Sequence, residues 1–194
     1  MLLLEGSFLF AQNTVAVAPV IDSVKSKWGR IKDVDGTKMT SSNDIIENIT
    51  QSKEYTTLVS VIEDAGLTET FKSKGPITVF APTNQAFNKL PAGELDSLIK
   101  PAHKLDLSYL LAYHAIAGRL TAKDIARKIN ANNGLATFTT IAGSKLVARI
   151  DENRNIVLVD ENGGESIISK FDIPQSNGIL HIVTSVLVPK SKVI

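Results

Sequence analysis

The sequence predicts an α+β domain, with helices in its first part and strands in its second. Apolar residues recur at helical spacing in most of the stretch before residue 134, whereas residues 135–188 contain short β-branched runs separated by turn residues. Helices followed by strands favour an α+β domain over the alternating units of a parallel sheet. The chain has 194 residues, 43% of them hydrophobic, which fits one globular domain preceded by a tail.

Residues 1–40 are predicted to precede the domain. We interpret residues 1–18 as a secretory signal peptide or its remnant, because Met1–Gln12 is mostly apolar and Ala16–Ala18 offers small residues at cleavage spacing. A short apolar strand or helix docked on the domain is the alternative. Residues 19–40 mix proline, glycine, lysine and serine with little periodicity, which predicts an extended arm. We therefore expect an exported protein, located in the periplasm, at the cell surface or outside the cell.

The domain itself is expected over residues 41–190, with 191–194 as a C-terminal tail. Ser41–Asn43 supplies N-cap candidates for a first helix, and Gly66 is placed to end a second one in the left-handed conformation of a C-cap. The same combination of apolar spacing and capping residues predicts a short third helix or turn and two later helices. These elements are expected around Ile45–Ile49, Leu58–Ala65, Leu67–Lys74, Asp106–His114 and Thr121–Ile129.

One buried strand interrupts the helical part. Ile77–Ala81 is a β-branched and aromatic run that Pro82 stops, because proline cannot donate to a strand ladder. Thr83 can then cap a helix that carries Ala86 and Phe87 inward. The remaining strands are separated by turns compatible with hairpins. They are expected at Ala136–Ile141, Lys145–Ile150, Asn155–Asp160, Ser166–Ser169 and Leu180–Val188.

Composition excludes several classes of protein. The chain has 21 Lys and Arg against 20 Asp and Glu, and this formal net charge of +1 gives no basic footprint for nucleic acid. The absence of cysteine excludes disulfides, thiolate nucleophiles and thiolate metal sites. No apolar run reaches the length of about 18 residues that a membrane-spanning helix needs, so no transmembrane segment is expected.

The sequence contains no recognisable catalytic or metal-binding motif. It lacks a glycine-rich phosphate loop and a Gly-x-Ser-x-Gly elbow. His103, His114 and His181 could in principle form a three-histidine metal site, but none has the close helical spacing of a metal motif. We interpret His114 and His181 as hydrogen-bonded core residues and His103 as a solvated one. We therefore expect no enzyme, no metal and no cofactor.

Two segments resemble the signature blocks of the fasciclin-domain family. Thr78–Phe87 is similar to the first block almost residue for residue, and Asn177–Pro189 is similar to the second. The pair Tyr113-His114 lies between them, where the family has its tyrosine–histidine pair. The upstream segments Val34–Met39 and Asp44–Asn48 resemble the lead-in of secreted bacterial members with one such domain, which are β-ig-h3-like. The resemblance covers about residues 41–190 and implies a twisted β-sandwich or wedge of about seven strands with a layer of N-terminal and inserted helices.

The residues of these blocks are expected to be mainly structural. Phe80 fills the core, Pro82 ends the strand, and Asn177-Gly178 makes the turn into the last strand. Polar tips on apolar side chains, as in the tyrosine–histidine pair, satisfy buried hydrogen bonds. The signature residues expected to build the core and its turns are Thr78, Phe80, Pro82, Thr83, Asn84, Phe87, Tyr113, His114, Asn177, Gly178 and His181.

Asp172-Ile173 is the candidate binding pair that the resemblance implies. In some animal members an Asp-Ile pair just before the second block serves integrin recognition. Here Lys170-Phe171 precedes the pair in place of Glu-Pro, and Pro174 follows it in place of Met, so the sequence departs from that pattern. The alternative is that Asp172 ends a strand or accepts hydrogen bonds from loop amides.

The resemblance implies a non-catalytic adhesion module that binds a cell-surface or matrix protein or a polysaccharide. Because some members of this fold hold apolar pigments, a carrier of a small apolar ligand in a groove is the alternative. Loops carry function on scaffolds of this kind, so the binding surface is expected at Pro91–His103, at Asp151–Arg154 or on the approach to Asp172.

Overall fold

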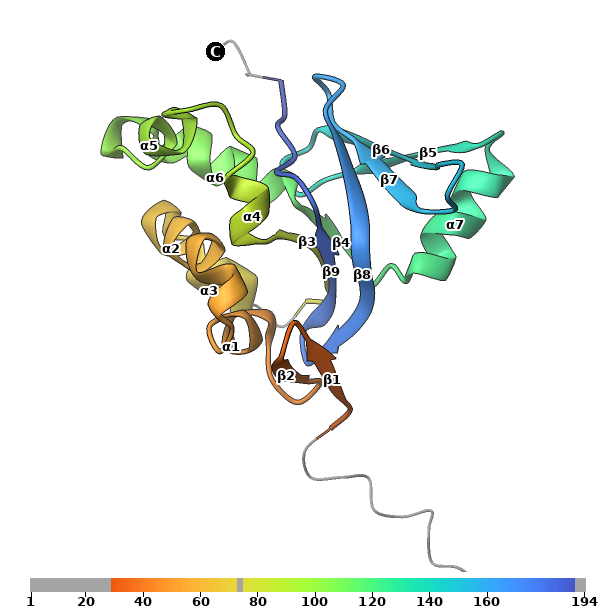
Figure 1. Ribbon diagram of the computed structural model, residues 1–194, viewed down its shortest axis with the longest axis horizontal. Helices are drawn as coiled ribbons and strands as arrows, with labels where there is room; N and C mark the ends of the chain where they lie inside the picture. The colour runs from red at the N-terminus through yellow and green to blue at the C-terminus, as the bar shows by residue number, and fades with distance from the viewer. Residues whose placement is uncertain (1–28, 73–74, 191–194) are drawn as a thin grey trace, which may run out of the picture.

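A seven-stranded mixed sheet forms the centre of the protein (Figure 1). The computed structural model describes residues 29–72 and 75–190. The spatial order of the strands is β4-β3-β9-β8-β7-β6-β5. Neighbouring strands pair antiparallel except β3 and β9, which are parallel. The strands are β3 (Ile77–Pro82), β4 (Ala115–Ala117), β5 (Leu135–Thr139), β6 (Lys145–Ile150), β7 (Ile156–Val159), β8 (Glu165–Gln175) and β9 (Gly178–Val183).

The parallel pair β3–β9 lies between the edge strand β4 and the long strand β8. All six residues of each strand are buried, which matches their continuous apolar sequences. The pairing places Thr78 opposite Ile179 and Phe80 opposite His181. Two sequence segments about a hundred residues apart thus become neighbouring strands.

The sheet curves until its two ends almost meet. Its edge strands are β4 and β5, and the loop after β5 returns to β4, where the Ile141 N–H donates to the Ala115 carbonyl at 2.7 Å. The adjacent Ala142 N–H donates to the Ala112 carbonyl at 3.3 Å. The first of these bonds occupies part of the β4 edge, and the second joins the same loop to α6, so the sheet is nearly barrel-shaped and does not leave that edge fully open.

Helices cover the sheet on two sides (Figure 1). A layer of short helices lies on one side, and α7 (Ala122–Ala131) lies on the other, against β5 and β6. The helices of the layer are α1 (Ile45–Ile49), α2 (Thr56–Ala65), α3 (Thr68–Lys72), α4 (Asn84–Phe87), α5 (Glu94–Leu98) and α6 (Lys104–Tyr113), with the 3-10 turns η1 (Lys53–Tyr55) and η2 (Pro101–His103). No helix among residues 29–72 and 75–190 has the length and apolar character needed to cross a membrane.

Two apolar cores result from this arrangement. One lies between the helical layer and the sheet and includes Ile62, Leu111 and Leu180. The other lies under α7 and includes Ile125 and Phe138. The α+β class predicted from the sequence is confirmed.

The segment before residue 41 differs from the expected extended arm. Residues 31–40 form a hairpin of β1 (Ile31–Val34) and β2 (Thr37–Thr40), and the side chains of Val34 and Met39 are fully buried. The turn residues Asp35 and Gly36 have φ angles of 52° and 78°. Two successive positive φ angles in a two-residue loop define a type I′ turn, for which Asp-Gly is a favoured sequence. The predicted signal over residues 1–18, residues 19–28 of the predicted arm and the tail 191–194 lie outside the described residues.

Other elements differ in extent. Residues 91–103, expected as a loop, contain α5 and η2. Strand β4 follows α6 directly and was not expected from its three residues. Strand β8 runs over eleven residues, well beyond the short strand expected at Ser166–Ser169. The last strand ends at Val183, before the expected Val188.

Candidate functional site

The strand of the first signature block lies inside the protein. Thr78 is fully buried, and its hydroxyl donates to the Gly118 carbonyl and accepts from the Leu120 N–H, both at 2.8 Å. Phe80 is 1% exposed, Pro82 ends β3, and Phe87 is 3% exposed on the inner side of α4. These side chains therefore connect β3 to its neighbours and do not present a surface.

The residues after the strand connect it to the helical layer. The Thr83 hydroxyl accepts from the Ala86 N–H at 3.2 Å and caps α4. The Asn84 amide accepts from the Thr57 N–H at 3.0 Å and donates to the Lys53 carbonyl at 2.8 Å. Asn84 thus joins α4 to η1 and α2, two elements distant from it in sequence.

The second block begins with a close backbone approach. The Asn177 side chain accepts from the Ile45 N–H at 3.2 Å and donates to the Phe71 carbonyl at 2.7 Å. A Cβ atom on Gly178 would lie 2.0 Å from the Ile77 carbonyl oxygen, far inside contact distance. Only glycine fits where β9 begins beside β3.

Tyr113 and His114 are buried at the C-terminal end of α6. The Tyr113 hydroxyl donates to the Lys145 carbonyl at 2.7 Å. The Leu187 N–H donates to His114 Nε2 at 2.9 Å, so the ring proton lies on Nδ1, which donates to the Leu110 carbonyl at 2.8 Å. Burial lowers the pKa of His114 to about 4. Both ring nitrogens of a neutral imidazole are therefore in use.

His181 is likewise a buried histidine whose ring nitrogens contact backbone groups. It is fully buried, it stacks on Phe80 with ring centroids 5.6 Å apart, and its Nε2 is 2.8 Å from the Leu120 carbonyl. The Asp172 N–H approaches its Nδ1 at 3.4 Å. Burial lowers the pKa of this imidazole as well. His103 is half exposed and lies 3.0 Å from Asp106, so the three histidines are not brought together.

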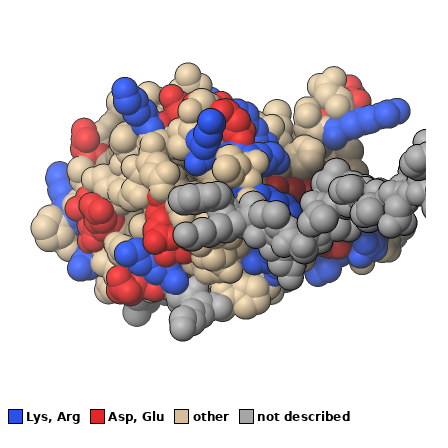
Figure 2. Space-filling model, turned by 90° about the horizontal axis from the view of Figure 1, so that it is seen from below, with Lys and Arg blue, Asp and Glu red and all other residues tan. Residues whose placement is uncertain are grey.

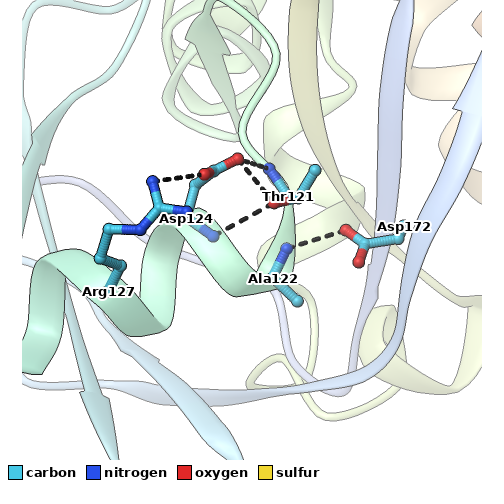
Figure 3. Close-up of polar contacts among 5 residues, drawn as sticks. All are labelled: Thr121, Ala122, Asp124, Arg127 and Asp172. Carbon is cyan, nitrogen blue, oxygen red and sulfur yellow. Dashed lines mark hydrogen bonds and ion pairs between the residues drawn. The ribbon is translucent and has the colours of Figure 1, made fainter.

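The candidate pair Asp172-Ile173 is oriented into the protein. Ile173 is fully buried in the core under the helical layer. Asp172 has a φ of 56°, and its Oδ1 accepts from the Ala122 N–H at 2.8 Å, in the first turn of α7 (Figure 3). The adjacent capping box of Thr121 and Asp124 satisfies further amides of that turn. The Asp172 carboxylate thus bonds to a helix amide, and the Ile173 side chain is not available at the surface.

A groove lined mostly by polar residue types was not predicted from the sequence. It has a volume of about 590 Å³ and lies between α4 and the paired strands β8 and β9, with the β1–β2 turn beside it. Of the predicted site residues, Thr83 lines it. The groove is lined by Asp35, Glu54, Thr83, Gln85, Lys89, Ser169, Lys170, Ile182, Val183 and Thr184. These residues come from five separate stretches of the chain and form no local motif, so no sequence pattern could have located the groove.

Lys and Arg side chains alternate with Asp and Glu on the face seen in Figure 2. Among residues 29–72 and 75–190, no group of three or more histidine and acidic side chains could hold a metal ion. One buried polar atom in this part of the chain, the Tyr55 hydroxyl, has no hydrogen-bond partner. Burial raises the pKa of that hydroxyl, and the nearby Asp35 and Glu54 carboxylates raise it further.

Comparisons with known proteins give matches over most of this chain. The family model described as Fasciclin domain matches residues 53–189. The protein sll1483 of Synechocystis sp. is 30% identical over 182 residues, covering 94% of this chain and 91% of that protein. Transforming growth factor-beta-induced protein ig-h3 of Oryctolagus cuniculus is 29% identical over 168 residues, covering 85% of this chain and 22% of that much longer protein.

A solved structure shows the same fold. The FAS1 domain pair from the insect cell adhesion molecule fasciclin I superposes with a TM-score of 0.56 at 23% identity, over 71% of this chain and 46% of that chain. No enzyme family is indicated by these matches. The buried signature strands, the family model that matches most of the chain and the bacterial relative of similar length together establish that the chain belongs to the fasciclin-domain family.

Proposed function

We propose that the protein is an extracytoplasmic, non-catalytic adhesion module that binds a cell-surface, matrix or polysaccharide partner. Family membership supports an interaction role, because the resemblance implies adhesion as the shared activity of fasciclin domains. Export, by way of the predicted signal over residues 1–18, is part of the same proposal.

One observation carries the non-catalytic part of this proposal. Two of the three histidines, His114 and His181, are 2% and 0% exposed, and their ring nitrogens contact backbone groups. A general base must come within hydrogen-bond reach of a substrate proton, and neither ring nitrogen has a free lone pair directed at solvent. These side chains are suited to holding the fold together.

The signature residues are accordingly proposed to be structural, and the binding surface to lie elsewhere on the domain. Their contacts to backbone groups of distant elements support this, as for Asn84, Asn177 and His114. The exposed region around the groove and the loop Asp151–Arg154 remain accessible to a partner.

A carrier of a small apolar ligand is less well supported. Apolar guests bind in pockets lined mainly by hydrophobic and aromatic side chains. Eight of the ten residues that line the groove have polar or charged side chains instead. Mass spectrometry of the protein purified under native conditions should therefore find no stoichiometric pigment or lipid.

The proposed function can be tested with the full chain immobilised on a sensor surface. The analytes are a purified bacterial surface polysaccharide, envelope fragments and collagen, and saturable binding of at least one is expected. The control is Gly178→Val, which cannot form the β3–β9 pair. If no analyte binds, or if the control binds equally well, the adhesion role is wrong.

A further inference from the structure

The groove between α4 and β8–β9 has the size and preorganisation of a ligand site. Its volume of about 590 Å³ lies within the range of about 300–1,000 Å³ found for small-molecule sites. A protein–protein contact would instead bury about 800 Å² on each partner over a flatter surface. The groove thus fits a small ligand or a short stretch of a chain molecule.

Polar contacts already fix its walls. An ion pair between Lys170 and Asp35 joins β8 to the β1–β2 turn at one side. The Lys89 ammonium donates to the Thr184 carbonyl at 2.7 Å at the other. A site whose side chains are held before the ligand arrives loses less conformational entropy on binding.

Two polar side chains in the groove remain without a partner. Within the described residues, the Glu54 carboxylate and the Gln85 amide make no hydrogen bond or ion pair. Glu54 is half-buried, where an unused acceptor is more costly than on an open surface. A carboxylate accepts from hydroxyl groups, and an amide both donates and accepts. Together they match a ligand that is rich in hydroxyls.

The charge of the lining selects a neutral ligand. Two lysines, Lys89 and Lys170, balance two acidic residues, Asp35 and Glu54, so the groove has no net charge. A polymer of either charge would meet groups of its own sign in this lining. No aromatic side chain lines the groove, so the affinity of one site must come from hydrogen bonds and is expected to be about millimolar.

We propose that this groove binds a neutral, hydroxyl-rich ligand, a short segment of polysaccharide, with Glu54 and Gln85 as the residues that contact its hydroxyl groups. The inference rests on the proposed adhesion function and names its partner class and its site. Five of the ten lining residues belong to the two signature blocks, Thr83 and Gln85 to the first and Ile182, Val183 and Thr184 to the second.

The test is an NMR titration of the ¹⁵N-labelled full chain with the neutral trisaccharides maltotriose and cellotriose, raised to about 50 mM. Amide shifts are expected at Lys170, Thr184 and the Gln85 side chain. A zwitterionic tripeptide and a ten-carbon fatty alcohol serve as the competing ligand classes.

Matched variants separate the groove from the rest of the surface. Gln85→Ala should weaken trisaccharide binding about tenfold, because it removes a hydrogen-bonding partner of the ligand. Glu54→Gln should weaken it severalfold, because it replaces a charged acceptor by a weaker neutral one. Glu63→Gln, an exposed residue of α2, makes the same charge change outside the groove. Asn88→Ala truncates an exposed amide at the end of α4. Both controls should bind as the parent does.

The outcomes distinguish this proposal from the broader one. Groove shifts with neither trisaccharide, or shifts only with the tripeptide or the fatty alcohol, overturn the assignment. If the sensor assay still shows binding that Glu54→Gln does not weaken, the adhesion function stands and acts through another surface. If the trisaccharides bind at the groove and the variants weaken that binding, the proposal is supported.

Discussion

At the β3–β9 junction, single positions accept only one type of residue. Gly178 is the clearest case, because its hydrogen occupies the space where a Cβ would meet the Ile77 carbonyl oxygen at 2.0 Å. That oxygen belongs to the paired strand and cannot move without breaking the ladder. The glycine therefore determines how closely the two signature strands approach.

We predict that Gly178→Ala lowers the free energy of unfolding by about 3 kcal/mol or more, which is at the severe end for a single methyl group. Urea unfolding followed by far-UV circular dichroism measures the change. Gly75→Ala is the matched control, since no atom lies within 4 Å of its added Cβ and its φ is not in the left-handed region. That variant should be neutral or slightly stabilising. Equal stability of the two variants would contradict the steric argument.

His114 makes stability depend on pH. Its folded pKa of about 4 is below the value of 6.5 for an unperturbed histidine, because burial disfavours the charged ring. Between these two values the unfolded chain binds more protons than the folded one, so stability rises with pH across this window and falls as the pH drops from 6.5 to 4. The full contribution is about 3 kcal/mol.

The prediction is measured as the free energy of unfolding at pH 7 and pH 4.5. The parent protein should lose stability toward pH 4.5, and His114→Gln should lose less over the same interval although it starts from a lower value. His103→Gln, on the half-exposed turn η2, is the control and should follow the parent profile. An unchanged pH dependence in His114→Gln would refute this role of the buried imidazole.

At the scale of elements, Asp172 connects β8 to the first turn of α7. Its carboxylate accepts from the Ala122 N–H at 2.8 Å, and its left-handed backbone conformation aims it there (Figure 3). Helix N-termini leave amides unsatisfied and favour negative charge, so a carboxylate from another element stabilises the helix where it meets the sheet.

Asp172→Ala is expected to destabilise the protein by about 2 kcal/mol, of which about 1 is the lost cap and the rest is the strain of alanine at a positive φ. Asp172→Asn keeps an acceptor and tolerates this conformation, so it should cost less than about 1 kcal/mol. Thermal unfolding of both variants tests this. A loss of partner binding in Asp172→Asn at unchanged stability would instead support a direct binding role.

Prediction from the sequence was correct where the residues within an element are enough to determine its conformation. The strand Ile77–Ala81, the helix caps at Thr83 and Thr121, and the C-cap at Gly66 all lie where their local signals placed them. The β1–β2 hairpin was missed because Asp35 and Gly36 lie in a stretch of low periodicity, although Asp-Gly between alternating residues is a hairpin signal. Strand β4 was missed because three residues cannot show a period, and its partner β3 decides its conformation.

Over the whole molecule, β3 and β9 belong to both apolar cores. Successive residues of a strand point to opposite sides, so Val79 packs under the helical layer while Phe80 packs toward α7. In β9, Leu180 belongs to the first core and Val183 to the second. The groove is also a property of the whole molecule, since five distant stretches must assemble before it exists. The family blocks could be found in the sequence, but the groove also needs Asp35, Glu54 and the β8 residues Ser169 and Lys170, which no block contains.

Because the two cores share these strands, we predict that the domain unfolds in one cooperative transition. Ile62→Ala lies in the first core and Ile125→Ala in the second, and both side chains are essentially fully buried. Each variant should lower the free energy of unfolding by about 2–4 kcal/mol. In each variant the unfolding midpoint should move by the same amount for every probe. The probes are far-UV circular dichroism and the NMR amide signals of α2 and α7. Earlier loss of the α7 signals than of the α2 signals in Ile125→Ala would show that the cores are energetically separate. Lys123→Ala, an exposed residue of α7, is the control and should leave the midpoint in place.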